Sequence, residues 1–128
     1  MKDQQDWRSE YRRKIEARVL PHPSSSCLLW IGAKKKSYGV INVSWFPFPK
    51  YPPQFYVHRA AYMVYSGQLQ LGDPRVQVVS HLCHASKCVN FLHLSLEPQS
   101  VNNRRKVCRR MRECQGHRGL PDCIFESA

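Results

Sequence analysis

The sequence predicts an α+β fold with a small antiparallel sheet. Short apolar segments of strand length alternate with turn residues over most of the chain, whereas helical periodicity is confined to an early, a middle and a late segment. The chain of 128 residues also contains nine prolines, six cysteines and six histidines. Because a chain of this length has a thin core, we expect metal ions or disulfides to stabilise it.

The first predicted element is a helix over residues 4–19. Its apolar residues recur every four positions and line one face: Trp7, Tyr11, Ile15 and Val19. We expect this face to pack on the body of the domain. Prolines that follow shortly after the helix end it, so residues 1–24 are predicted to form a helix and a linker.

Two strands of a hairpin are predicted next, over residues 27–31 and 40–45. The turn between them has three lysines at its tip. The segment that follows, 46–53, reads FPFPKYPP. Proline lacks the N–H group that a central strand needs, so we expect this segment to be a loop.

The second half of the chain is predicted to form a short helix and then a strand–loop–strand–helix unit. The short helix begins near His58 or Arg59 and ends at Gly67, since glycine readily adopts the left-handed conformation that ends helices. The elements predicted after it are a strand over 75–82, a strand over 93–97 and a helix that starts at Pro98.

The net charge of +11 indicates a polyanionic partner, with nucleic acid as the first expectation and a membrane surface as the second. No apolar run is long enough to span a bilayer, and residues 1–14 lack the apolar core of a signal peptide. We therefore expect a reducing intracellular compartment. Cysteines there favour metal binding over disulfide formation.

A first metal site is predicted from Cys83, Cys88 and His93, which follow the spacing C-x4-C-x4-H. Thiolate and imidazole together suit tetrahedral Zn²⁺, which needs a fourth ligand. Cys27 could supply this ligand from an early strand, and His81 or His84 could supply it locally.

A second metal site is predicted in the last segment, which has few apolar residues and little reason to fold without metal. Its ligands form a closed Cys3His set: Cys108, Cys114, His117 and Cys123. With Cys27 assigned to the first site, all six cysteines serve two four-ligand zinc sites. Three disulfides in a secreted domain are the alternative, which the interleaved histidines disfavour.

The stretch SHLCHASKCVNFLHLSLE (80–97), followed by Asn102 and Cys108, resembles the His-Me finger nucleases (ββα-metal, HNH-like). It is most similar to the small homing endonucleases with zinc-binding loops. The early Cys27 and the segment YVHRAAYMVYSG also match, so the resemblance covers roughly residues 27–123. It implies a ββα-metal core within 25–107 and a zinc-bound loop over 108–128.

The resemblance implies roles for single residues. His81 corresponds to the general base, and Asn102 to the ligand of a catalytic Mg²⁺, or of Mn²⁺ or Ca²⁺ in its place. The eight cysteine and histidine ligands proposed above correspond to two structural zinc sites. The implied activity is Mg²⁺-dependent hydrolysis of double-stranded DNA, leaving 5′-phosphate and 3′-hydroxyl ends. His84 matches no catalytic position, and we expect it to face solvent or phosphate.

The family pattern also includes an arginine on the central sheet that contacts the scissile phosphate. The corresponding region here offers Lys50 as the nearest cation, with Arg59 as the alternative. Other expected DNA contacts lie at the lysine-rich turn, on the strand after it and in the basic run 104–112. The full set of expected contacts is Lys34, Lys35, Lys36, Asn42, Lys50, Arg59, Arg104, Arg105 and Lys106.

An alternative function is a zinc-stabilised nucleic-acid-binding protein that is catalytically inactive or repurposed. It would share the fold, zinc and charge, but it would not require His81 and Asn102. Both residues are present, so we favour the nuclease. The resemblance leaves a homodimer open, because the family's longer dimerising tail has no match here, and it implies the nucleus if the source is eukaryotic.

Overall fold

The computed structural model describes residues 6–43, 47–48 and 54–125. Within these ranges no helix is long and apolar enough to cross a lipid bilayer. The elements follow one another in this order: α1 (Asp6–Glu16), β1 (Val19–Pro21), β2 (Leu28–Trp30), β3 (Lys34–Lys35), β4 (Tyr38–Asn42), β5 (Gln54–Tyr56), α2 (Val57–Ser66), β6 (Gln77–His81), the short 3-10 helix η1 (Phe91–His93), β7 (Leu94–Pro98) and α3 (Gln99–Met111).

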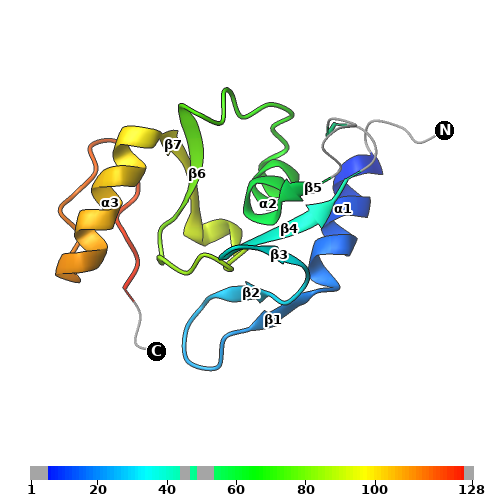
Figure 1. The fold of residues 1–128 in the computed structure, drawn as a ribbon, viewed down its shortest axis with the longest axis horizontal. Coiled ribbons are helices and arrows are strands. Elements are labelled where there is room, and N and C mark those ends of the chain that lie inside the picture. The colour runs from blue at the N-terminus through cyan, green and yellow to red at the C-terminus, as the bar shows by residue number, and fades with distance from the viewer. Residues whose placement is uncertain (1–5, 44–46, 49–53, 126–128) are drawn as a thin grey trace.

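The predicted α+β class is confirmed, and the antiparallel strands are divided among three small sheets, β1-β2, β3-β4-β5 and β6-β7 (Figure 1). The predicted hairpin between residues 27–31 and 40–45 is wrong. β2 pairs with β1, whereas β4 pairs with β3 and β5. Gly32 separates β2 from β3, and a Cβ atom there would meet the Trp30 ring at 2.5 Å. The chain therefore bends closely around Trp30 and passes into another sheet.

Helix α1 is shorter than predicted and ends at Glu16. Val19 is the first residue of β1, where it pairs with Trp30 and needs extended backbone. The rest of the predicted apolar face is confirmed, because Trp7, Tyr11 and Ile15 are all buried. Helix α1 thus packs on the body of the domain through this face, as expected, and contributes to the main core.

The core lies between α1, α2 and the sheets, with α2 near the middle of the molecule (Figure 1). Ala60 and Ala61 of α2 are both fully buried, and their small side chains allow neighbouring elements to approach the helix closely. The helix ends as predicted at Gly67, whose φ of 79° lies in the left-handed region.

The strand–loop–strand–helix unit occupies the other end of the molecule (Figure 1). β6 and β7 are antiparallel, with His81 opposite Leu94, and α3 follows directly. Over its full described length, α3 buries only Val101, Arg105 and Cys108. The helix runs through the predicted boundary at residue 108, so the first ligand of the second metal site is helical.

We expect Tyr11→Ala to lower the free energy of unfolding by about 3–4 kcal/mol, because it empties a fully buried ring site. The Tyr11 ring lies edge-on to Phe48, with ring centroids 4.7 Å apart. Leu20→Ala is the control, since Leu20 is 55% exposed. Urea unfolding at fixed zinc concentration measures both changes, and equal small losses would contradict the placement of α1 in the core.

Candidate metal centres and active-site cavity

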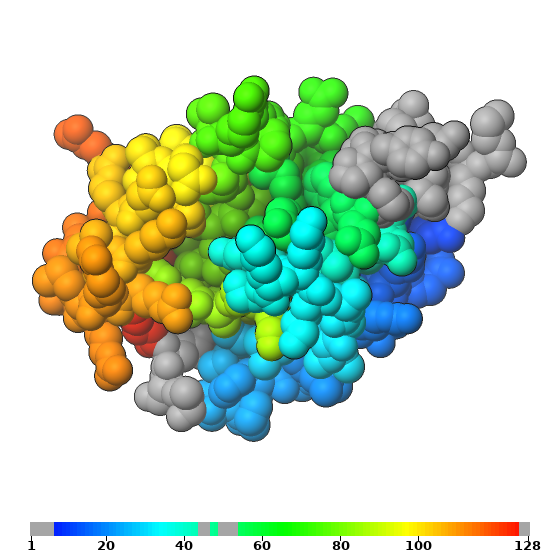
Figure 2. All heavy atoms as spheres, viewed as in Figure 1, coloured from blue at the N-terminus to red at the C-terminus, as the bar shows by residue number. Residues whose placement is uncertain are grey.

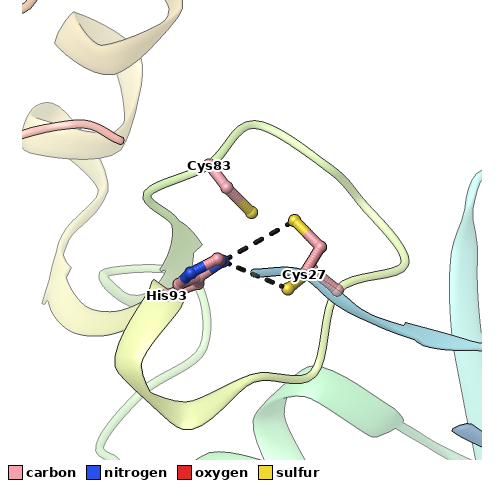
Figure 3. A group of neighbouring side chains, drawn as sticks. Cys27, Cys83 and His93 are labelled. Atoms are coloured by element: carbon pink, nitrogen blue, oxygen red, sulfur yellow. Dashed lines mark hydrogen bonds between the residues drawn. The ribbon is translucent and has the colours of Figure 1, made fainter. Parts of the chain in front are cut away.

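The first metal centre brings together the ligand atoms of Cys27, Cys83, Cys88 and His93, all within 4.8 Å of one another. His93 Nδ1 lies 3.6 Å from Cys27 Sγ and 3.5 Å from Cys88 Sγ. The side chains converge on one point (Figure 3). In a tetrahedral zinc site the sulfur–nitrogen edge is about 3.5 Å, given the usual bond lengths. The donor set and its spacing therefore fit Zn²⁺.

Local hydrogen bonds explain why these ligands meet. Val89 N donates to Leu28 O, and Trp30 N donates to Lys87 O, so the loop after β6 is fastened along β2 next to Cys27. Cys27 is therefore the fourth ligand, which resolves the choice that the sequence left open among it, His81 and His84.

His93 is oriented by its own surroundings. The side chain of Asn90 caps the 3-10 helix that carries His93 by accepting a hydrogen bond from Leu92 N. Ser26 Oγ lies 2.7 Å from His93 Nε2. This contact at the far ring nitrogen turns Nδ1 toward the sulfur atoms. Such contacts behind a ligand fix the imidazole for metal binding.

The second metal centre is formed by the four predicted ligands, Cys108, Cys114, His117 and Cys123. His117 Nε2 lies 3.5 Å from the Sγ atoms of both Cys108 and Cys123. Burial raises the pKa of Cys114, but hydrogen bonds from the backbone N–H groups of Cys123 and Gly116 outweigh it and leave the pKa lowered. This environment favours the thiolate that a metal requires.

Arg105 connects the second metal centre to β7. Its Nε and Nη2 donate to the two carboxylate oxygens of Glu97 at 2.6 and 2.8 Å, Nη2 also donates to Pro121 O, and Nη1 donates to Cys123 Sγ at 3.4 Å. Burial raises the pKa of Glu97, but hydrogen bonds from Arg105 and neighbouring serines prevail and lower it. The side chain of Arg105 is only 2% exposed. The expectation that Arg105 contacts DNA is therefore wrong, because its donors are already bound.

His81 and Asn102 line one cavity of about 120 Å³ between β6, the zinc-bound loop and α3. Ser80 Oγ donates to Asn102 Oδ1 at 2.9 Å, which holds the amide beside the end of β6. Figure 2 shows the corresponding hollow between α3, in orange, and the β3–β4 hairpin, in cyan. The residues that line the cavity are Tyr38, His81, His84, Ser86, Asn102, Arg105, Lys106 and Arg109.

The imidazole of His81 is held neutral. Burial lowers its pKa to about 4, although a hydrogen bond to the Cys88 backbone acts in the opposite direction. A bond that favours the protonated ring must run from the ring N–H to the carbonyl oxygen. The other nitrogen, Nε2, is buried and has no hydrogen-bond partner among the described residues. One ring nitrogen of a residue that lines the cavity therefore has no hydrogen bond within the described protein.

Sequence reasoning did not identify the aromatic neighbours of His81. The His58 ring lies 4.5 Å from the His81 ring, and Tyr38 stacks on His81 at 6.2 Å between centroids. Burial, followed by the charges of His81 and Arg59, places the pKa of His58 well below its usual value. No sequence pattern links these residues, since they come from α2, β4 and β6 and meet only in the folded chain.

His84 is half-buried rather than fully solvent-facing, and its backbone has a φ of 63°. Its ring lies 5.3 Å from Phe125, and it lines the cavity beside His81. Burial lowers its pKa first, and the charges of Arg109 and Arg105 add to this effect. Of the two expected surroundings of His84, solvent and phosphate, full exposure to solvent does not hold, and a place near phosphate stays a prediction.

Of the other expected DNA contacts, the lysines of the β3–β4 hairpin are exposed, and Lys36 has a φ of 57° at the turn. Ser86 Oγ donates to Ser37 O, which ties the hairpin to the zinc-bound loop beside the cavity. Asn42 is exposed, but it lines a separate cavity of about 530 Å³ between α1 and β4. Lys50 lies outside the described residues.

Arg59 does not reach the cavity of His81. Its guanidinium donates to Gln77 O and Gly72 O, and Gln77 is the first residue of β6, whereas His81 is the last. The expectation that Arg59 binds the scissile phosphate is therefore wrong. Arg104 is exposed but does not line the cavity, so its position gives no support to the expected DNA contact there, whereas Lys106 lines the cavity. Arg109, which we did not single out from the sequence, also lines it.

The ββα unit, its two closed Cys3His centres and the histidine–asparagine cavity define a zinc-stabilised protein of the His-Me finger class. A family model described as the zinc-binding loop region of homing endonuclease matches residues 26–123. The chain belongs to this family, and the membership supports a nuclease-type function. No curated protein and no solved structure matches the chain.

We expect the protein to bind two zinc ions per chain and Cys83→Ser or Cys114→Ser to bind about one, because each substitution removes a ligand from one centre. Elemental analysis of purified protein measures the ratio. His84→Ala is the control and should keep both ions, since His84 belongs to neither group. Loss of zinc from that variant would contradict the assignment of Cys27.

We expect Arg105→Ala to destabilise the fold by about 3–5 kcal/mol, because it leaves the buried Glu97 carboxylate without its partner. Arg104→Ala, one position earlier on the exposed side of α3, should change stability by less than about 0.5 kcal/mol. Denaturant unfolding with zinc present compares the two variants. Similar effects would show that the buried ion pair does not hold α3.

Proposed function

We propose that the protein is a Mg²⁺-dependent DNA endonuclease that hydrolyses phosphodiester bonds to leave 5′-phosphate and 3′-hydroxyl ends. The observation that supports this most directly is the shared cavity of His81 and Asn102. Both residues line it, in a protein whose family membership supports a nuclease-type function.

In this proposal His81 is the general base. Its neutral ring can accept a proton at Nε2 from a water molecule that attacks phosphorus, while the Cys88 carbonyl fixes the opposite nitrogen. The rings of His58 and Tyr38 pack beside it and limit its rotation. The base is therefore oriented before substrate arrives, and little rearrangement is needed for proton transfer.

Asn102 is the residue that would hold the catalytic Mg²⁺, or Mn²⁺ or Ca²⁺ in its place. An amide oxygen suits a hard cation, and Asn102 Oδ1 is oriented by Ser80 at the cavity wall. When bound, the ion would stabilise negative charge on the leaving 3′ oxygen. One protein ligand is sufficient if water and phosphate oxygens complete the shell, so we expect tight binding only with DNA.

The two zinc centres have a structural role in this proposal. Each has four protein ligands, which leaves no open position for a reacting water. The first centre holds the loop that follows His81, and the second begins on the helix that carries Asn102. The zinc ions would thus fix the separation of the base and the metal-binding amide.

The proposed substrate is double-stranded DNA. The net charge of +11 provides general attraction to phosphate. A side-chain hydrogen bond with Lys34, followed by the charge of Lys34, lowers the pKa of Lys87, so positive charge is concentrated where the hairpin meets the zinc-bound loop. A hairpin of two short strands can also enter the major groove. A homodimer and a nuclear location in a eukaryote are further parts of this proposal.

We expect the protein to nick or linearise supercoiled plasmid with Mg²⁺ but not with EDTA, and His81→Ala to cut at least about 100-fold more slowly. Gel analysis of several plasmids and genomic fragments measures the cleavage. His22→Ala is the matched control, because His22 lies in the β1–β2 turn away from the cavity.

Equal cutting by His81→Ala and the unchanged protein would remove His81 from the proposed role, provided that the variant still binds two zinc ions. Tight DNA binding with no cleavage of any substrate would favour the alternative, a zinc-stabilised DNA-binding protein without activity. End-labelling of the products distinguishes 5′-phosphate from 5′-hydroxyl ends.

A further inference from the structure

A phosphodiester in the cavity of His81 and Asn102 needs a cation beside it. The phosphate carries one negative charge, and attack by water adds more during the transition state. Tyr38, Ser86 and Asn102, which also line the cavity, supply no positive charge. A positively charged side chain at the same cavity would both attract the phosphate and stabilise the reaction.

Three cationic residues line this cavity, namely Arg105, Lys106 and Arg109. Arg105 does not meet the need, because its charge is balanced by Glu97 and its donors are bound within the protein. Lys106 and Arg109 are exposed. No ion pair engages either of them within the part of the chain that the structure describes.

Helix geometry explains why these two cations reach the cavity. At about 100° per residue, Lys106 lies about 40° and Arg109 about 20° around the axis of α3 from Asn102. The three side chains therefore form one row on the face that borders the hollow seen in Figure 2. Arg104 lies about 200° from Asn102, on the far side of the helix, which agrees with its absence from the cavity lining.

We propose that Arg109, assisted by Lys106, is the cation that grips the phosphate undergoing reaction. The guanidinium can bind two phosphate oxygens in parallel, whereas Lys106 contributes a single point charge. This proposal rests on the proposed nuclease function and names its phosphate-binding residues. It puts the cation on the same helix as the metal-binding amide rather than on the sheet, where the sequence suggested it.

The placement has a consequence for Arg105. Arg105 is buried against Glu97, whereas Lys106, at the next position, and Arg109, one turn later, are exposed at the cavity. The buried member holds the helix at a fixed rotation, so Lys106 and Arg109 face the cavity together with Asn102. The basic run therefore divides into an anchoring residue, two phosphate-binding residues and residues on the outer face.

The test compares Arg109→Gln and Lys106→Gln with Arg104→Gln, which removes the same charge from the far side of α3. With Mg²⁺ and enzyme in excess over plasmid, we expect Arg109→Gln to slow the cleavage step at least tenfold, Lys106→Gln to slow it less, and Arg104→Gln to slow it less than twofold. Arg109→Lys should recover part of the loss. Equal rates for Arg109→Gln and Arg104→Gln would overturn the proposal.

A binding measurement with Ca²⁺ separates this proposal from the nuclease function. We expect Arg109→Gln to weaken binding to a duplex and to reduce the slope of log affinity against log salt by about one, the loss of one phosphate contact. Arg104→Gln should change the affinity for the duplex and the salt slope less than Arg109→Gln does. If the unchanged protein cuts nothing, the nuclease proposal fails, and this comparison alone decides whether Arg109 contacts phosphate. Equal slopes for the two variants would count against that contact.

Discussion

The buried ion pair between Arg105 and Glu97 is the interaction on which the end of the molecule around the cavity of His81 and Asn102 depends. Helix α3 buries few side chains, so apolar packing alone fixes neither its position nor its rotation. The pair joins α3 to β7 through two hydrogen bonds and continues to the second metal centre through Cys123. Removing one partner would leave an unpaired buried charge, which is energetically costly. The pair therefore strongly favours one position and one rotation of α3.

The metal centres extend this constraint to both sides of the cavity. The first centre fastens the loop that follows His81 to β2, and the second fastens the end of α3 to the last described segment. A small core could not hold two separate elements at a fixed distance by apolar contact alone. The cavity therefore lies between two attached elements, and the fold itself holds His81 and Asn102 at its wall.

The eight cysteine and histidine residues that the sequence predicted as zinc ligands lie in two groups that could each hold a metal ion, because the spacing of such residues reflects coordination. The sequence failed for strand pairing, since β2 is placed by contacts with the loop around Cys88 that lie far away in the chain. The sequence also could not show that Arg105 is buried and Arg109 exposed, because the residue types in a basic run do not indicate which member is buried. The position of His58 against His81 likewise follows only from tertiary packing.

Helix α1 lies outside the region that matches the family, yet three of its residues belong to the main core. The region that matches the family is therefore shorter than the region that folds around one core. A shortened protein that starts at residue 26 would leave the apolar surface of α2 uncovered, and such surfaces promote aggregation. The family region therefore packs against a helix that lies outside it, so its boundaries in a comparison do not define an autonomous domain.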